Sequence, residues 1–200
     1  MSGRDEVLAR VAAARAGAPV PEVPRDYRRE GRLAPGSAAT LDLLHERLVD
    51  YKARVRRCEP TGLPAVITEL LGSERVVVPP GLPDGWVDAA GVDDGALTAA
   101  ELDRFDAVVT AATAAAAETG TIVLDGSAGQ GRRALSLIPD HHVCVVRADQ
   151  VVHSVPELIS RLDAVRPLTF VSGPSATSDI ELQRVEGVHG PRRLDVILLG

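Results

Sequence analysis

The chain of 200 residues has little cysteine, few aromatic side chains and no excess of basic charge. Its two cysteines, Cys58 and Cys144, cannot by themselves ligate an iron–sulfur cluster, which commonly takes four thiolates. Aromatic residues make up only 2% of the chain, so Val, Leu, Ile and Ala must fill the interior. A formal net charge of -6 and a pI near 5.4 argue against a general nucleic-acid binder, which usually presents a basic face.

Long apolar runs are also missing. No stretch approaches the roughly 18 apolar residues expected of a membrane span. Asp5 and Glu6 stand where a signal peptide would carry its apolar segment. We therefore expect a cytoplasmic protein with reduced thiols and no membrane span. The five histidines include no pair with the spacing of a zinc-binding helix, so no metal site is expected.

The N-terminal part, residues 1–40, is predicted to be a helical arm with a proline-rich linker. Ser2 and Asp5 have the spacing of a capping box for a short helix. Three prolines between residues 19 and 24 then exclude a continuous helix and favour an extended chain. The remaining residues, 41–200, are assigned to one α/β domain.

Helical and strand-like segments alternate along this domain, which predicts an α/β fold with a mostly parallel sheet flanked by helices. Gly72 is placed to stop one of the helices. An Ala-rich helical turn is expected over Thr113 to Glu118. The other expected helices lie near residues 37–52, 63–71, 98–101 and 154–162, and the expected strands at 53–58, 75–78, 106–110, 121–124, 142–147, 168–171 and 194–199.

The most informative stretch runs from Leu168 to Pro191. A short apolar strand breaks at a turn of small residues, and a helix is expected from about Ser178 to Val185. Free backbone N–H groups converge at such a helix start and can bind an anion. The alternative is that these hydroxyls and carboxylates only satisfy the helix N–H groups. The candidate ligand-binding residues here are Ser172, Gly173, Pro174, Ser175, Thr177 and Asp179.

Glu118 is the candidate catalytic residue, because a carboxylate beside many alanines can be desolvated and act as acid, base or nucleophile. The alternative is an exposed residue at a helix end, or an acceptor for nearby backbone. Arg132 or Arg133 is suited to pair with an anionic substrate. The other candidate ligand-binding residues are Thr119, Gly120, Thr121, Arg133 and His189.

Four ordered blocks are familiar when taken together: ETGTIVL, SLIPDHHVCVV, SGPSATSDIEL and GVHGP. They resemble the LUD-domain family and, within it, the lactate utilization protein C group. The resemblance is strong over the C-terminal half. It implies a fold like that of the glucosamine-phosphate deaminase, ribose-phosphate isomerase and CoA-transferase superfamily.

The resemblance also implies a function. Family members belong to a bacterial system that oxidises L-lactate to pyruvate, with iron–sulfur clusters expected in partner proteins and no cofactor bound by this chain alone. A small anionic ligand is expected where the segments ETGT, SGPS and VHGP meet over one end of a shared sheet. Two alternatives stay open: an independent enzyme with a fold like that of CoA transferases or folate cyclo-ligases, using Glu118, and a non-catalytic scaffold or regulatory subunit.

Overall fold

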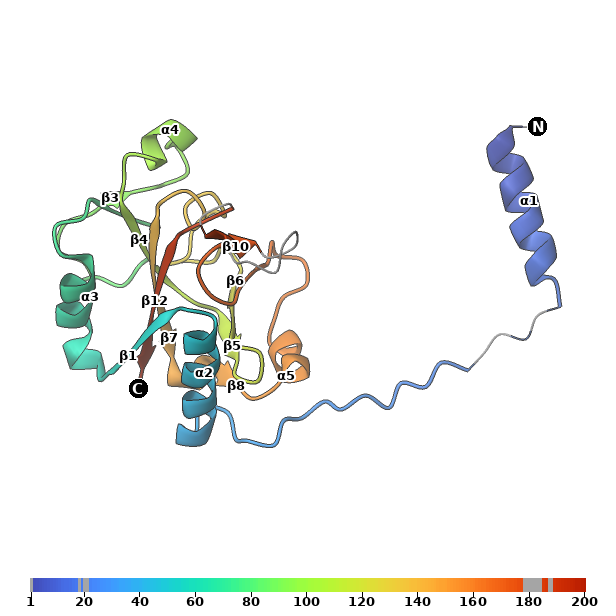
Figure 1. Ribbon diagram of the computed structural model, residues 1–200, viewed down its shortest axis with the longest axis horizontal. Helices are drawn as coiled ribbons and strands as arrows, with labels where there is room; N and C mark the ends of the chain where they lie inside the picture. Colours follow the sequence, from blue (N-terminus) through green and yellow to red (C-terminus); the bar gives the residue numbers. More distant parts are fainter. Residues whose placement is uncertain (1, 18, 20–21, 178–184, 187–188) are drawn as a thin grey trace.

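The central element is a six-stranded sheet in the order β1-β12-β7-β4-β2-β3, in which every neighbouring pair is parallel. A computed structural model describes residues 2–17, 19, 22–177, 185–186 and 189–200 (Figure 1). The parallel sheet predicted from the alternation of apolar segments is confirmed. The strands of this sheet are β1 (Arg54–Cys58), β2 (Val76–Val78), β3 (Gly91–Val92), β4 (Ala107–Ala111), β7 (His141–Arg147) and β12 (Arg193–Leu199).

Most of the helices predicted from the sequence are present. The helix over residues 63–71 has its predicted bounds and ends at Gly72. Ser37 caps α2, and Thr98 and Glu101 form a capping box for α4. The helices are α1 (Gly3–Arg15), α2 (Ala38–Asp50), α3 (Leu63–Leu71), α4 (Ala99–Leu102) and α5 (Val155–Ser160), with short 3₁₀ turns at Pro60–Gly62 and Ala148–Gln150.

A second sheet packs beside the first, and its order is β8-β5-β6-β9. β5 pairs antiparallel with β6 and parallel with β8, and β6 pairs antiparallel with β9. Its strands are β5 (Ala114–Ala116), β6 (Thr121–Leu124), β8 (Val151–Val152) and β9 (Thr169–Val171).

The Ala-rich segment of the second sheet corrects a sequence prediction. Residues from Thr113 to Glu118 do not form a helical turn, because Ala114–Ala116 is strand β5. Ala115 packs into the cluster shared with the central sheet, while its two neighbours face the cluster under α5. Tertiary packing thus overrides the helix propensity of alanine, since all three alanines of this strand are buried between two packed layers.

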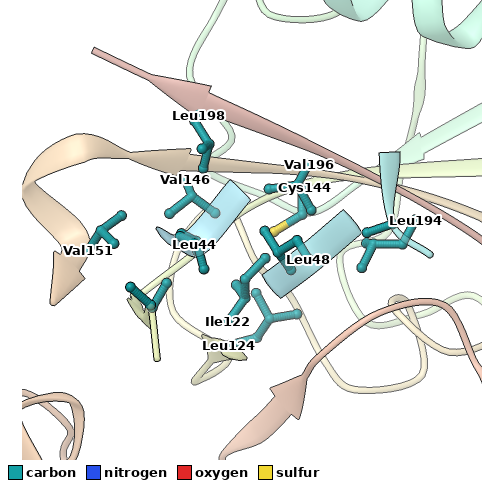
Figure 2. Close-up of a cluster of buried hydrophobic side chains, with 14 residues drawn as sticks. Leu44, Leu48, Ile122, Leu124, Cys144, Val146, Val151, Leu194, Val196 and Leu198 are labelled. Carbon is teal, nitrogen blue, oxygen red and sulfur yellow. The ribbon is translucent and has the colours of Figure 1, made fainter. Parts of the chain in front are cut away.

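Burial on both faces explains the continuous apolar runs in β7 and β12. One face of these strands packs on α3, which contributes Leu63, Ile67 and Leu71 to that layer. The other face packs on α2 and the second sheet, and Figure 1 shows α3 and α2 on opposite sides of the central sheet. Figure 2 shows Leu44 and Leu48 of α2 among side chains from both sheets, and all are almost fully buried.

The N-terminal arm contains the predicted helix. In α1 the Ser2–Asp5 capping box is present, and no residue of the helix is buried. Figure 1 shows α1 far from the sheets at the end of an extended segment. Hydrogen bonds to the rest of the chain begin before residue 40: Gly36 N–H donates to Val151 O at 2.9 Å. The domain boundary at residue 40 stays a prediction.

The expected helix from Ser178 to Val185 is wrong at its C-terminal end. Val185 lies in strand β11 (Val185–Glu186), which pairs antiparallel with β10 (Ala176–Thr177). Residues 178–184, which include Asp179, lie outside the described residues. Within the described ranges, no helix has the length and apolar character that a membrane crossing requires.

Candidate ligand-binding cleft

A cavity of about 230 Å³ lies between the two sheets, beside the turn that follows β9. Val171 at the end of β9 lines one side, and His142 and Leu194 near the starts of β7 and β12 line the other. The cavity therefore lies between two sheets, whereas the sequence suggested the end of one. The remaining lining residues include Arg133, Ser136, Leu137, Ser172, Gly173, Pro174, Ser175 and His189.

Two of the predicted segments meet at this cavity. Ser175 N–H donates to the carbonyl oxygen of Pro191 at 2.8 Å, and His189 N–H donates to Ser175 Oγ at 3.0 Å. These two bonds hold the SGPS turn against the segment that leads into β12. The hydroxyl of Ser175 thus positions the backbone at His189.

The backbone at Gly173 lies so close to the end of α2 that only glycine fits there. Its φ is +128°, and a Cβ there would lie 2.7 Å from the carbonyl oxygen of Tyr51, at the end of α2. Any other side chain would push the turn away from α2. The glycine therefore fixes the place of Ser172 and Ser175 at the cavity.

The adjacent arginines 132 and 133 have different environments. Arg132 Nε lies 2.8 Å from Asp93 Oδ2, and its Nη2 also contacts the carbonyl oxygen of Leu97. The Asp93 carboxylate is fully buried. Burial raises the pKa of Asp93, but the hydrogen bonds from Arg132 and from the Gly95 N–H outweigh it and hold that pKa below its usual value. Arg132 thus has a structural role, because its guanidinium is bound to Asp93 and Leu97.

Arg133 is exposed and lines the 230 Å³ cavity. Among the ion pairs of the described part of the chain, none involves its guanidinium group. A guanidinium has five N–H donors in a planar fork that matches carboxylate and phosphate oxygens. Arg133 is therefore available to an anion among the described residues of this cleft.

A larger cavity of about 870 Å³ continues from the first. The two cavities share Arg133, Ser136 and Thr169. The larger one adjoins the segments that follow β2 and β3, at the carboxyl ends of parallel strands where ligands commonly bind in α/β proteins. Its walls include Pro80, Gly81, Asp93, Asp94, Gly95, Leu124, Ser127, Pro167 and Leu168.

The sequence prediction missed His142 as a cavity residue. It is buried, with 2% of its surface exposed, and its Nε2 lies 2.8 Å from Thr110 Oγ1. Burial, aided by the nearby charge of His141, lowers the pKa of His142 to about 4. The available signal was its place in the buried run from His142 to Val146, where a polar side chain needs a specific partner.

Glu118 lies away from both cavities. Its Oε1 accepts a hydrogen bond from Val155 N–H at 3.0 Å, and its Oε2 lies 3.1 Å from Arg28 Nη2. The carboxylate therefore satisfies the start of α5 and holds the N-terminal segment. A reaction at Glu118 stays a prediction, and these contacts supply a structural role.

The rest of the ETGT segment contacts the cleft indirectly. The hydroxyl oxygens of Thr121 and Ser172 lie 2.9 Å apart, and Thr119 Oγ1 lies 2.9 Å from Thr121 Oγ1. Gly120 has a φ of +60°, and a Cβ there would lie 2.8 Å from the Arg47 Cβ. This segment thus supports Ser172 from outside the cavity. Thr177 lies in β10.

These features define an α/β protein built on a parallel sheet, with a mixed sheet against one face and a cleft between the two. The LUD domain family model matches residues 87–199. Lactate utilization protein C of Deinococcus radiodurans is 51% identical over 178 residues, which cover 83% of this chain and 84% of that protein. The chain belongs to the LUD domain family.

Two further similarities agree with this assignment. Lactate utilization protein C of Bacillus pumilus is 38% identical over 91 residues, 42% of this chain and 38% of that protein. A crystal structure of a DUF162 family protein from Deinococcus radiodurans superposes with a TM-score of 0.73 at 43% identity, covering 84% of this chain and 99% of that one. Membership of the glucosamine-phosphate deaminase, ribose-phosphate isomerase and CoA-transferase superfamily stays a prediction.

Proposed function

We propose that this chain is a component of a cytoplasmic bacterial system that oxidises L-lactate to pyruvate, and that it binds a small anionic ligand in the cleft. The observation that carries the role is the 51% identity with a lactate utilization protein C over more than four fifths of both chains. The residues that line the 230 Å³ cavity lie within the matched LUD domain.

Iron–sulfur partner proteins complete the proposed system. Oxidation of lactate to pyruvate releases two electrons and two protons, so an electron acceptor is needed. This chain has two cysteines, Cys58 and Cys144, fewer than the four thiolates that a cluster commonly takes. Cys144 is buried, and burial raises the pKa of its thiol to about 12, which disfavours the thiolate that ligates metals. The clusters are therefore assigned to the partners.

Ligand binding in the cleft follows from Arg133 and the groups around it. Arg133 brings a positive charge to the lining of the 230 Å³ cavity, and Ser172 and His189, which also line it, supply hydrogen-bonding groups. A cavity of this size is smaller than the pockets of about 300–1,000 Å³ that hold drug-sized ligands. It therefore suits a small carboxylate.

A reconstitution assay tests the role. The purified full chain is assayed alone, and then with the iron–sulfur proteins of the same organism, for L-lactate-dependent reduction of an artificial electron acceptor. We expect activity only in the combined sample. Activity of this chain alone would favour the independent enzyme. Full activity of the partners without this chain would leave it a scaffold or regulator, and no activity in any mixture would contradict the lactate role.

A genetic test examines the contribution of Arg133 alone. In a strain that lacks this gene, the Arg133→Ala variant is expected to restore growth on L-lactate poorly. The matched control is Arg29→Ala, which removes an exposed arginine outside both cavities. Equal growth of the two strains would contradict the proposed place of the ligand.

A further inference from the structure

Helix α1 presents an apolar stripe with an arginine at each end. Five side chains share this face at positions i, i+3, i+4, i+7 and i+11, namely Arg4, Val7, Leu8, Val11 and Arg15. No residue of α1 is buried, and the three aliphatic side chains are 58, 54 and 49% exposed. A lone helix of 13 residues is marginal in water, because most helical stability comes from packing of an apolar face. The stripe of α1 therefore needs another surface to pack against.

The charges on this face of α1 are both positive. Among the ion pairs of the described residues, none involves Arg4 or Arg15. The two acids of α1, Asp5 and Glu6, lie outside the stripe, and Asp5 accepts hydrogen bonds from Ser2 in the capping box. A surface that combines carboxylates with an exposed aliphatic group complements the stripe in both charge and polarity.

The outer face of α2 is such a surface. It forms a groove of about 510 Å³ on the side of the helix away from the buried Leu44 and Leu48. Three carboxylates and one guanidinium line the groove, so its net charge is negative. Val49 adds an aliphatic surface that is 46% exposed. The lining residues are Asp42, His45, Glu46, Val49, Asp50 and Arg57.

The carboxylates of this groove have only weak partners within the chain. Asp42 Oδ1 lies 2.8 Å from Arg57 Nη1. Arg47 Nη1 lies 3.5 Å from Glu46 Oε1 and 3.6 Å from Asp50 Oδ2. All five side chains are exposed, and ion pairs between exposed side chains contribute little to stability. Each carboxylate can therefore exchange one guanidinium for another at little cost.

We propose that α1 of one copy of this chain docks on the acidic face of α2 of a second copy, and that the exchange is reciprocal. With a rise of 1.5 Å per residue, Arg4 and Arg15 lie about 16 Å apart along α1. Asp42 and Asp50 lie about 12 Å apart along α2, a difference that long arginine side chains span. The aliphatic stripe then covers Val49. Two identical contacts related by a twofold axis close the dimer.

The linker between α1 and the domain favours a second copy over the chain's own α2. Pro19, Pro21 and Pro24 favour an extended, semi-rigid spacer of roughly 3 Å per residue. The segment reaches the domain where Arg28 pairs with Glu118, and Figure 1 shows α1 far from α2. A stiff spacer that leads away from its own domain opposes folding back, whereas it carries the helix to a neighbouring molecule. This inference does not depend on the lactate role or on the ligand of the cleft.

Analytical ultracentrifugation of the full chain tests the dimer. Two short helices bury little surface, so we expect a weak dimer with a dissociation constant of roughly 10–100 µM. Unfolding experiments at a few micromolar therefore report the monomer. Removal of residues 1–20 should leave a monomer up to roughly 500 µM. Salt at about 1 M should weaken the dimer of the full chain, since the Debye length then falls to about 3 Å.

A matched pair of substitutions in α1 tests the stripe itself. Arg4→Glu reverses a charge within the stripe and should raise the dissociation constant of the dimer roughly 10-fold. An acid in the first turn favours the helix, so this loss would not come from unwinding of α1. Arg10→Glu makes the same change outside the stripe and should alter the constant by no more than about 2-fold. Both variants leave the domain folded, because nothing in α1 is buried.

A charge swap identifies the surface on which α1 docks. Glu46→Arg in the middle of the groove should weaken the dimer roughly 10-fold, and the double variant Arg4→Glu with Glu46→Arg should recover part of that loss. A full chain that is monomeric at every concentration would overturn the proposal and would leave α1 free or docked on its own domain. A dimer that persists without residues 1–20, equal effects of Arg4→Glu and Arg10→Glu, or no recovery in a folded double variant would also overturn it.

Discussion

The carboxylate of Glu118 accepts a hydrogen bond from the backbone N–H of Val155 at 3.0 Å, at the first residue of α5. Its second oxygen pairs with Arg28 from the N-terminal segment. One side chain thus joins three segments that are far apart in the sequence. This arrangement gives Glu118 a structural role outside the cleft.

Replacement of Glu118 is expected to change stability more than binding. Glu118→Ala removes the acceptor of Val155 N–H and should lower the free energy of unfolding by about 1–2 kcal/mol. Glu118→Gln keeps an acceptor oxygen and should cost less. Urea unfolding measures the first effect, and calorimetry with L-lactate should show unchanged affinity. A loss of affinity in a stable Glu118→Gln variant would instead support the catalytic role suggested by the sequence.

The two adjacent arginines are expected to behave in opposite ways. Arg132→Ala leaves the buried Asp93 carboxylate without its cation and should lower the free energy of unfolding by about 2 kcal/mol. The loss is limited because Arg132 is itself partly exposed, and solvent weakens its interaction with Asp93. Arg133→Ala should change it by no more than about 0.5 kcal/mol while weakening binding of the anion.

A double variant checks the assignment of Arg132. Asp93→Ala combined with Arg132→Ala should recover part of the stability lost in Arg132→Ala, because no unpaired buried charge remains. Thermal or urea unfolding measures all three proteins. If Arg133→Ala proved the more destabilising of the two arginine variants, the assignment would be reversed.

Stability is expected to fall below neutral pH because of His142. Burial lowers its pKa from 6.5 to about 4, so between these values the unfolded chain binds a proton that the folded chain does not. The stabilisation is complete above about pH 6.5 and is lost as the pH falls toward 4, by at most about 3 kcal/mol.

Unfolding in urea at pH 7, 5.5 and 4.5 measures this dependence. In His142→Gln the corresponding part of the slope should be absent. The hydrogen bonds and charge of Arg75 lower the pKa of Asp106 to about 2. Asp106 therefore titrates below this pH range and does not affect the difference in slope between the two proteins. Equal slopes in both proteins would show that His142 titrates normally.

The N-terminal arm is expected to contribute to stability only in its second half. Removal of residues 1–20 takes away α1, in which nothing is buried, and should change the free energy of unfolding by no more than about 0.5 kcal/mol. Removal of residues 1–36 also deletes the contacts of Arg28 and Gly36, and should cost about 1–2 kcal/mol. Comparable losses in both truncated chains would indicate that α1 docks on the body.

Local patterns in the sequence were sufficient for most elements of the fold. Leu63 to Leu71 followed by Gly72, and the capping box at Ser2, predicted helices that the structure contains. These features predict helices because hydrophobic periodicity, helix caps and terminating glycines depend only on neighbours within a few residues. The blocks ETGTIVL and SGPSATSDIEL likewise pointed to the family shown by the comparisons.

The sequence by itself determined most helices and strands, the parallel sheet and the family, because each follows from short-range spacing or from residues in order along the chain. Only the tertiary structure decided that Ala114–Ala116 is a strand, that Glu118 holds α5, and that Arg133 and His142 line one cavity. Those relationships join residues distant in sequence, and they depend on how the two sheets pack, which no local pattern encodes.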